Sequence, residues 1–324
     1  MGEQKKYDVI CVGQVVQDIL VTGIPQDAFV SGKDTVLAKT LTLGVGGDAA
    51  NESAILGKLG DHVALLARLD RRNVGDMIYE DMKREHVDPA LIIRPDDCET
   101  FSTVVVIHPD GNHSFMVGPG KNFNLEWSDI DLEVFKETRA VTAASLLALG
   151  ELDTNGIDRI FTTAQENGAL TIADMSFDMR GIGPHGVDHV FPHVDYLMPS
   201  LDEAVYVTGS KDPDEIADYF LAAGVKNVLL KLGGEGCFFK NHTERFFTDP
   251  FEVTPVDTTG CGDNFVAAFT HCLLKGLSHQ ECAEFASATG ALNSQGIGAH
   301  TFVQSEEQVL EFMKTAPKRV IKRD

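Results

Sequence analysis

The nine residues from 257 to 265, DTTGCGDNF, place two glycines and two carboxylates directly before an apolar segment of helical periodicity. This pattern predicts a helix whose N-terminus lies at residues 260–262, where unpaired backbone N–H groups and the helix dipole favour an anion. The two glycines allow a bulky anion to approach the backbone. A carboxylate at Asp263 would repel that anion, unless it takes a proton from a nucleophile while the amides stabilise a phosphoryl group. The alternative is an Asp that caps a helix behind a tight turn.

The same stretch resembles the C-terminal signature of the ribokinase-like (PfkB) carbohydrate kinases, Asp-Thr-Thr-Gly-x-Gly-Asp-x-Phe followed by small residues. The resemblance implies that Asp263 is the general base, and that the amides of Gly260, Cys261 and Gly262 form an anion hole for the transferred phosphate. Cys261 stands where the family usually carries Ala or Gly. Because the backbone N–H does the chemistry, we expect a small thiol to be tolerated there.

A second glycine-rich stretch, residues 44–51 (GVGGDAAN), precedes a helical segment that ends in Leu-Gly. It resembles the family signature Gly-Gly-x-x-x-Asn, which implies that Gly46, Gly47 and Asn51 line the sugar pocket. The alternative is a plain glycine turn before a helix. Asp48 stands where sugar-binding relatives often have Lys, and a carboxylate disfavours a phosphorylated substrate. We therefore expect a neutral, polyhydroxylated acceptor.

Two further acidic residues are candidates for binding the acceptor. Asp18 lies inside the apolar run 15–21, where a carboxylate is costly unless it is paired or useful. The resemblance implies that Asp18 binds sugar hydroxyls, while the residues alone also allow a solvent-facing position on an edge strand. Glu151 follows a predicted strand and aligns loosely with another hydroxyl acceptor of the family.

Two segments resemble the nucleotide site of the family. Residues 228–237 form a predicted buried strand that runs into a Leu-Gly-x-x-Gly turn, and this turn borders the nucleotide in the family. A small-residue helix over 283–293 resembles the segment that flanks the adenine. The residues implied as nucleotide contacts are Lys231, Gly233, Gly236 and Asn293.

Metal ligands are implied at two places. Residues 200–203, Ser-Leu-Asp-Glu, resemble the family motif Asn-x-x-Glu, whose Glu organises Mg²⁺ through water. Glu203 fits this motif, although Ser200 replaces the Asn, and the residues alone favour a Ser cap with a Glu in the first helical turn. Asp257 and Thr259 match positions that hold a monovalent cation, such as K⁺, in some members.

The composition excludes other classes of function. The 324 residues carry 27 basic and 49 acidic side chains, a formal net charge of −22, which argues against nucleic acid or an anionic membrane as partner. Apolar runs stay short of the roughly 18 residues that a membrane span needs. Residues 1–6 are polar and lead directly into a strand, so we expect no signal peptide and a cytoplasmic protein. The six cysteines form no C-x-x-C pair, which favours reduced thiols.

Strands alternate with helices along the whole chain, which predicts one doubly wound α/β domain over residues 1–324 with a mostly parallel, Rossmann-like sheet. The resemblance implies the ribokinase-like version of this fold. Segments near 14–45 and 99–118 show strand and hairpin patterns, including a Pro-Asp-Gly-Asn turn at 109–112. In the family such strands form a small β lid over the sugar. Lid-mediated dimers are common there, so we expect a homodimer by analogy.

Together these patterns predict an ATP- and Mg²⁺-dependent kinase in which Asp263 deprotonates a hydroxyl of a small, unphosphorylated sugar. One alternative is a nucleoside kinase of the same fold, whose pocket would need apolar or aromatic lining. Another is a catalytically idle sugar-binding regulator, which would be expected to have lost the base or the anion-hole glycines. A dinucleotide-dependent oxidoreductase is disfavoured because no glycine fingerprint follows the first strand.

Overall fold

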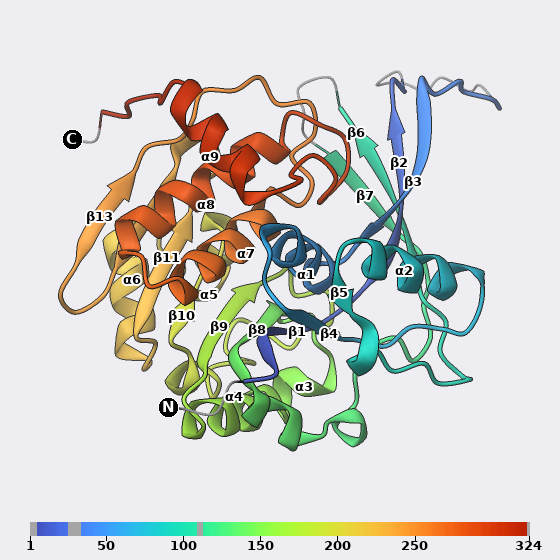
Figure 1. The fold of residues 1–324 in the computed structure, drawn as a ribbon, viewed down its shortest axis with the longest axis horizontal. Helices are drawn as coiled ribbons and strands as arrows, with labels where there is room; N and C mark the ends of the chain where they lie inside the picture. Colours follow the sequence, from blue (N-terminus) through green and yellow to red (C-terminus); the bar gives the residue numbers. More distant parts are fainter. Residues whose placement is uncertain (1–4, 25–33, 109–112, 323–324) are drawn as a thin grey trace.

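The computed structural model describes residues 5–24, 34–108 and 113–322. A nine-stranded sheet with strand order β13-β12-β11-β10-β9-β8-β1-β4-β5 forms the centre of the molecule (Figure 1). Neighbouring strands from β11 to β5 pair in parallel, and β12 and β13 add two antiparallel strands at one edge. The strands of this sheet are β1 (Tyr7–Val12), β4 (Val63–Leu66), β5 (Val87–Asp88), β8 (Thr138–Leu146), β9 (Leu170–Met175), β10 (Tyr196–Leu197), β11 (Asn227–Lys231), β12 (Cys237–Lys240) and β13 (Arg245–Thr248).

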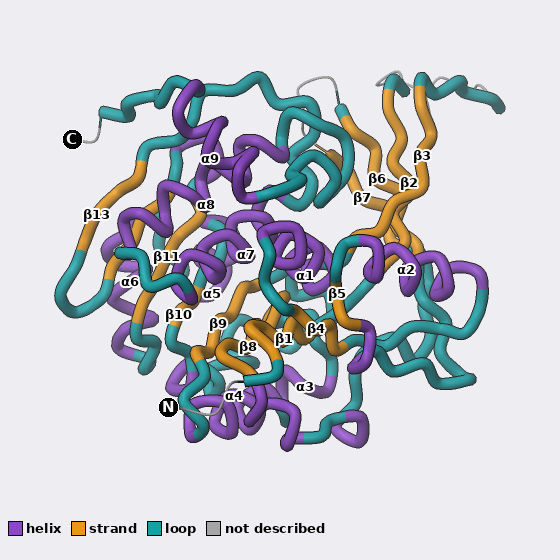
Figure 2. The backbone as a smooth tube through the Cα atoms, in the orientation of Figure 1, coloured by secondary structure: helices purple, strands orange, loops and turns teal. Residues whose placement is uncertain are grey.

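Helices cover both faces of the sheet (Figure 2), so the predicted doubly wound α/β fold is confirmed. Successive side chains of a strand point to opposite faces. Accordingly, Val9 and Cys11 of β1 pack into one apolar cluster, while Ile10 and Val12 pack into the other. The first cluster includes residues of α1 (Asp48–Leu59), α2 (Asn73–Arg84), α7 (Cys261–Leu274), α8 (His279–Asn293) and α9 (Glu306–Thr315). The second includes residues of α3 (Glu151–Thr154), α4 (Ile157–Glu166), α5 (Leu201–Thr208) and α6 (Pro213–Ala222).

Five short 3₁₀ helices lie in the connections of the described residues: η1 (Pro89–Leu91), η2 (Trp127–Asp129), η3 (Leu132–Glu137), η4 (Phe191–His193) and η5 (Gly233–Glu235). Within the same part of the chain, no helix combines the length and the apolar character that crossing a membrane requires. All six cysteines are free thiols.

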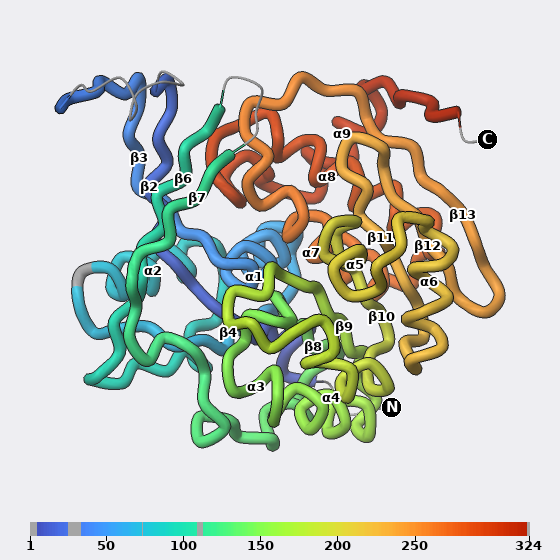
Figure 3. Tube along the Cα trace, turned by 180° about the vertical axis from the view of Figure 1, so that it is seen from behind, coloured from blue at the N-terminus to red at the C-terminus, as the bar shows by residue number. Residues whose placement is uncertain are grey.

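A second, smaller sheet stands out from one side of the central sheet (Figures 1 and 3). Its order is β3-β2-β6-β7, and its strands are β2 (Val16–Thr22), β3 (Thr40–Gly46), β6 (Ser102–Ile107) and β7 (His113–Val117). These strands come from the two segments predicted to form the lid, and β3 extends one residue beyond them to Gly46. We call this four-stranded sheet the lid. The turn predicted at 109–112 lies outside the described residues.

Candidate active site

Polar side chains gather at the carboxyl ends of the parallel strands, which is where open α/β sheets bind ligands. Asp174 is the penultimate residue of β9, and Lys231 is the last residue of β11. Their side chains form an ion pair that is almost wholly buried. Near the end of β8, the Ser145 hydroxyl donates a hydrogen bond to Asp48 at the start of α1.

Asp263 lies in the first turn of α7, as predicted, and only 9% of it is exposed. Gly260 precedes the helix with a φ of 72°, and a Cβ atom on it would lie 2.2 Å from the carbonyl oxygen of Ala299. Glycine is therefore required for both its conformation and its close approach. The Asn264 amide donates to the carbonyl oxygens of Gly260 and Ala299, each at 2.7 Å, and so fixes the start of the helix against the loop that follows α8.

The Asp263 carboxylate accepts a hydrogen bond of 2.6 Å from Nδ2 of Asn51, which lies in α1. Burial, followed by the negative charge of Asp48, raises the pKa of Asp263 well above its usual range, and the bond from Asn51 opposes this rise. A carboxyl group whose pKa is raised accepts a proton more readily, which suits a general base. The other polar atom of the Asn51 amide, Oδ1, bonds to His300, so a direct contact of Asn51 with a sugar stays a prediction.

The ammonium group of Lys231 lies close to the predicted anion hole. The Nζ atom of Lys231 would be 3.3 Å from a Cβ atom built on Gly262. Burial acts to lower the pKa of Lys231, but the carboxylates of Asp174 and Glu203 outweigh burial and raise it, so the side chain carries its charge. Among the three amides expected to form the hole, that of Cys261 donates to the carbonyl oxygen of Thr258 at 3.2 Å.

Asp18 lies at the base of the lid, in β2, and is 6% exposed. Its Oδ2 atom would be 2.1 Å from a Cβ atom on Gly46, so glycine at 46 is required to make room for this carboxylate. Gly47 adopts a φ of 92° immediately before α1 and approaches the backbone of Gln14. The predicted acceptor residues Asp18, Gly46, Gly47 and Asn51 therefore come together where the lid joins α1.

Asp257 and Thr259 stabilise the loop before α7 through hydrogen bonds. The Asp257 carboxylate accepts hydrogen bonds from the backbone and the hydroxyl of Thr259, at 2.9 and 2.6 Å, and from the backbone of Gly298 at 2.9 Å. Asn293 donates to the carbonyl oxygens of Thr259 and Ala299, at 3.2 and 3.1 Å. These hydrogen bonds hold the loop in place, and the binding of a K⁺ ion there stays a prediction.

The glycine turn after β11 contains two glycines with different surroundings. Gly233 has a φ of 56° and open space where a Cβ atom would be, which suits a surface that a nucleotide could approach. Gly236 has a φ of 90°, and a Cβ atom there would lie 2.0 Å from the carbonyl oxygen of Thr248. Packing against β13 is therefore a sufficient reason for glycine at 236.

Two predicted site residues have local partners. Glu203 and Ser200 form a capping box at the start of α5, in which the Glu203 carboxylate accepts from the Ser200 amide at 2.7 Å. One Glu203 oxygen thus caps the helix, and the charge of the side chain still acts on Lys231. Glu151 is exposed at the start of α3 and accepts from the backbone of Trp127 at 3.3 Å. Among the contacts described for Glu151, none joins it to Asp263.

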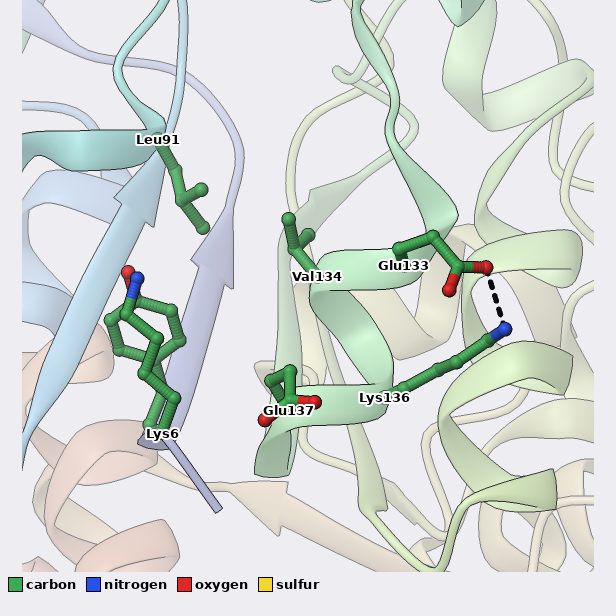
Figure 4. A pocket seen from close by; sticks show the side chains of 7 residues that line it. Lys6, Leu91, Glu133, Val134, Lys136 and Glu137 are labelled. Atoms are coloured by element: carbon green, nitrogen blue, oxygen red, sulfur yellow. Dashed lines mark hydrogen bonds and ion pairs between the residues drawn. The ribbon is translucent and has the colours of Figure 1, made fainter.

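A hollow of about 260 Å³ lies near the amino end of strand β1 in the central sheet (Figure 4). It begins at Lys6 and Tyr7, at the start of β1, and η3 forms its other wall. Its lining consists of Lys6, Tyr7, Leu91, Glu133, Val134, Lys136 and Glu137. Because Asp174 and Lys231 lie at the carboxyl ends of their strands, this hollow is separate from the cluster around Asp263.

Sequence reasoning did not find three residues that contact the site. Asn264 clamps the start of α7, His300 bonds to Asn51, and His113 of β7 lies 3.4 Å from the Thr258 hydroxyl, which joins the lid to the loop before α7. Asn264 lies inside the recognised signature and could have been found there. The two histidines belong to no local pattern, because their partners are distant in sequence.

An aspartate at a glycine-flanked helix N-terminus, with a lysine beside it, is suited to phosphoryl transfer, and together with this fold it defines a class of α/β kinases. Residues 6–306 match the pfkB family carbohydrate kinases. The chain therefore belongs to this family and is a sugar kinase.

Known proteins are similar to this chain over almost its whole length. The fructokinase-1 of Oryza sativa is 24% identical over 95% of this chain and 98% of its own. A structure of Arabidopsis thaliana ribokinase complexed with ribose and ATP has a TM-score of 0.77, with 27% identity over 95% of this chain and 99% of that chain. A ribokinase-like protein of E. coli in complex with ATP and Mg²⁺ has a TM-score of 0.83, at 21% identity over 95% and 99% of the two chains. The last likeness shows the fold alone.

Proposed function

We propose that this protein transfers the γ-phosphate of MgATP to a hydroxyl group of a small, unphosphorylated sugar of the ribose or fructose type. The observation that carries the proposal is the buried Asp263 at the N-terminus of α7, held by Asn51 and placed beside Lys231 and Gly262. The relatives that act on ribose and fructose support the sugar class.

In this proposal Asp263 takes the proton of the attacking hydroxyl. Its raised pKa increases its basicity, while the hydrogen bond from Asn51 favours the ionised form that can accept a proton. The proton is transferred to the Asp263 carboxylate as the hydroxyl oxygen attacks phosphorus. General-base catalysis of this kind contributes about 10²- to 10⁴-fold to a rate.

Lys231 and the amides at 260–262 stabilise the transferring phosphoryl group. The ammonium of Lys231 provides a fixed positive charge beside Gly262, where the α7 dipole is also positive. The carboxylate oxygen of Glu203 that does not cap α5 can hold a water of Mg²⁺. When bound, Mg²⁺ neutralises phosphate charge, and the Gly233 turn is the expected border of the nucleotide.

The acidic surroundings favour an uncharged acceptor. Asp48 raises the pKa of both Asp18 and Asp263, so all three carboxylates are close enough to influence one another. A phosphate already present on the acceptor would be repelled by this group of charges. Asp18 would instead accept hydrogen bonds from hydroxyl groups.

Four further expectations belong to the proposal. Residues 1–324 act as one kinase domain whose lid covers the sugar, and two copies associate through the lid. A K⁺ ion at the loop of Asp257 and Thr259 would appear as activation by KCl over NaCl. A cytoplasmic location agrees with the need for ATP and with six free thiols.

The test is ADP release with MgATP over a panel of pentoses, hexoses, keto-sugar acids and nucleosides. We expect turnover on one unphosphorylated sugar, and a loss of about 10²- to 10⁴-fold in kcat in Asp263→Asn with the KM for ATP nearly unchanged. The control is Asp195→Asn. Asp195 is also buried, but it bonds to Thr171 at the amino end of β9, whereas the predicted site lies at the carboxyl ends of the strands.

Other outcomes separate the alternatives. Turnover only on nucleosides would identify a nucleoside kinase. ATP binding without turnover on any acceptor would indicate a regulator. Full activity of Asp263→Asn on a sugar would remove the assignment of the base and leave the sugar kinase in place.

A further inference from the structure

A chain of contacts leads from the predicted base to a helix at the edge of the molecule. Asp263 accepts from Nδ2 of Asn51 at 2.6 Å, and Oδ1 of Asn51 lies 2.9 Å from Nδ1 of His300. The Nε2 atom of His300 lies 3.8 Å from a carboxylate oxygen of Asp81, in α2. Asn51 and His300 are 3% and 2% exposed, so water cannot replace their mutual hydrogen bond easily.

The chemistry of the groups fixes the direction of each hydrogen bond. An ionised carboxylate only accepts, so the NH₂ group of the Asn51 amide must face Asp263. The amide oxygen then faces His300, and the Nδ1 atom of that ring must carry a proton. The other ring nitrogen faces Asp81, whose pKa the neighbouring His300 ring holds below its usual range. Asp81 therefore presents a negative charge to the Nε2 side of the ring, opposite the hydrogen bond to Asn51.

We propose that His300, oriented by Asp81, is a positioning residue for the catalytic base. Its Nδ1–H donates to Oδ1 of Asn51 and prevents the amide from rotating by 180°, which would turn a carbonyl oxygen toward Asp263. The proposal rests on the proposed function, in which Asp263 is the base. In this role His300 acts through Asn51 and needs no contact of its own with a substrate.

Other charged groups face this chain from the elements packed around it. Asp263 is surrounded by Asp48 and Glu52 of α1, Asp174 of β9, Lys231 of β11 and Cys261 of its own helix. The groups around His300 are Asp81 of α2, Glu85 directly after α2, and Lys58 of α1. All of these residues are unchanged in the variants of His300 and His271 used to test the proposal, so their charges act equally on Asp263 in each variant.

The ligand atoms of Asp81, Glu85 and His300 lie within 4.8 Å of one another, which is close enough for a metal ion. The chain supplies its own cations to both carboxylates, however. Lys58 lies 3.1 Å from Glu85, and Arg84 lies 2.7 Å from Asp81. The carboxylates are thus already paired, which favours orientation of His300 over metal binding as the role of the group.

The test compares two substitutions of the same residue. In His300→Asn, the side-chain amide nitrogen can occupy the place of Nδ1 and still donate to Asn51, whereas in His300→Leu no donor remains. The readout is the pKa of Asp263, followed by the ¹³C shift of its carboxyl carbon in protein labelled at aspartate and assigned by its loss in Asp263→Asn. This titration needs no turnover, so it is independent of whether the sugar panel succeeds.

We expect the pKa of Asp263 to rise by about one unit in His300→Leu, because a bond to the charged form is lost. In His300→Asn the rise should be less than half as large. In assays with the sugar that is turned over, kcat near neutral pH should fall about tenfold in the Leu variant, with its pH profile displaced upward and the KM for ATP unchanged.

The control is His271→Leu. His271 is also buried and bonded to a carboxylate, Asp61 at 2.7 Å, and it lies in α7 near the end remote from Asp263. The proposal is overturned if His300→Leu leaves the pKa of Asp263 unchanged, if His300→Asn shifts it as far as Leu does, or if His271→Leu shifts it equally. Failure of the sugar panel alone would instead count against the proposed function.

Discussion

Carboxylates near the base of the lid titrate far from their usual range because they are buried together. Burial is the largest cause for Asp18, and the charges of Asp257 and Asp48 add to it, so the pKa of Asp18 is raised to about 7. A carboxyl group in this range changes its charge near neutral pH, which is common in binding and catalytic sites. It also makes the stability of the protein depend on pH.

Asp18→Asn should stabilise the protein at high pH. The pKa of Asp18 is higher in the folded protein than in the unfolded chain, where it is about 3.9. The folded state therefore binds the proton more tightly, and the associated stability is complete below about pH 4 and is lost as the pH rises through about 7. Apart from any effect that does not depend on pH, we expect the variant and the wild type to be about equally stable at pH 4. By pH 8 the variant should gain about 4 kcal/mol in relative stability.

Urea unfolding at pH 4, 6 and 8 measures this difference. A relative stability that is flat with pH, or that falls in the variant as the pH rises, would contradict the assigned shift. Asp178→Asn is the control, because Asp178 has a lowered pKa, with bonds from Gly183, Tyr206 and Ile182 outweighing the effect of burial, and should show the opposite trend.

At the scale of elements, helix α7 is fixed at both ends by glycines that differ in one respect. Gly260 and Gly276 have φ values of 72° and 77°, which L-residues other than glycine rarely adopt. A Cβ atom on Gly276 would meet no atom within 4 Å, whereas one on Gly260 would lie 2.2 Å from the carbonyl oxygen of Ala299. The N-terminal glycine thus permits both a turn and the contact with the loop after α8.

Gly260→Ala should cost clearly more stability than Gly276→Ala. The backbone conformation alone costs about 1 kcal/mol at either position, and relief of the clash at 260 should add about 2 kcal/mol. Moving the start of α7 would also displace Asp263, so we expect Gly260→Ala to lose most of its kinase activity, while Gly276→Ala keeps it. Denaturant unfolding and ADP release measure both effects. Equal costs at the two positions would show that the loop yields without strain.

At the scale of the whole molecule, the lid exposes an unusual amount of apolar surface. Leu41, Leu43, Phe115, Met116 and Val117 are each between 46% and 65% exposed. They lie on β3 and β7, which are the two edge strands of the lid. Exposed apolar side chains of this kind commonly mark an interface, and an edge strand can pair with another chain.

The double variant Leu41→Lys/Leu43→Lys should convert the predicted homodimer into a monomer. The charges would be buried at a lid-to-lid interface, and lysine on an edge strand also opposes pairing with a second strand. Light scattering of the purified protein measures the mass. Val320→Lys is the control, since Val320 is 78% exposed but lies near the C-terminus, away from the lid. A wild-type protein that is monomeric at assay concentrations would contradict the prediction.

Local patterns in the sequence were enough for the parts of the site that depend on neighbours in the chain. The period of the apolar residues after Gly262 placed Asp263 in the first turn of a helix, and the capping box of Ser200 and Glu203 could likewise be anticipated. The alternation of strands and helices led to the fold in the same way. These features arise from backbone geometry and from interactions within a few residues.

The sequence by itself thus determined the fold class, the family signatures and the place of Asp263. Only the tertiary structure decided what surrounds that residue. Asn51 and His300 are separated by 249 positions along the chain, and Lys231 meets Asp174 across 57. Such contacts follow from how strands and helices pack, because packing brings segments that are distant in the sequence together at the carboxyl ends of the strands. The spacing of neighbouring residues in the sequence does not reveal these contacts.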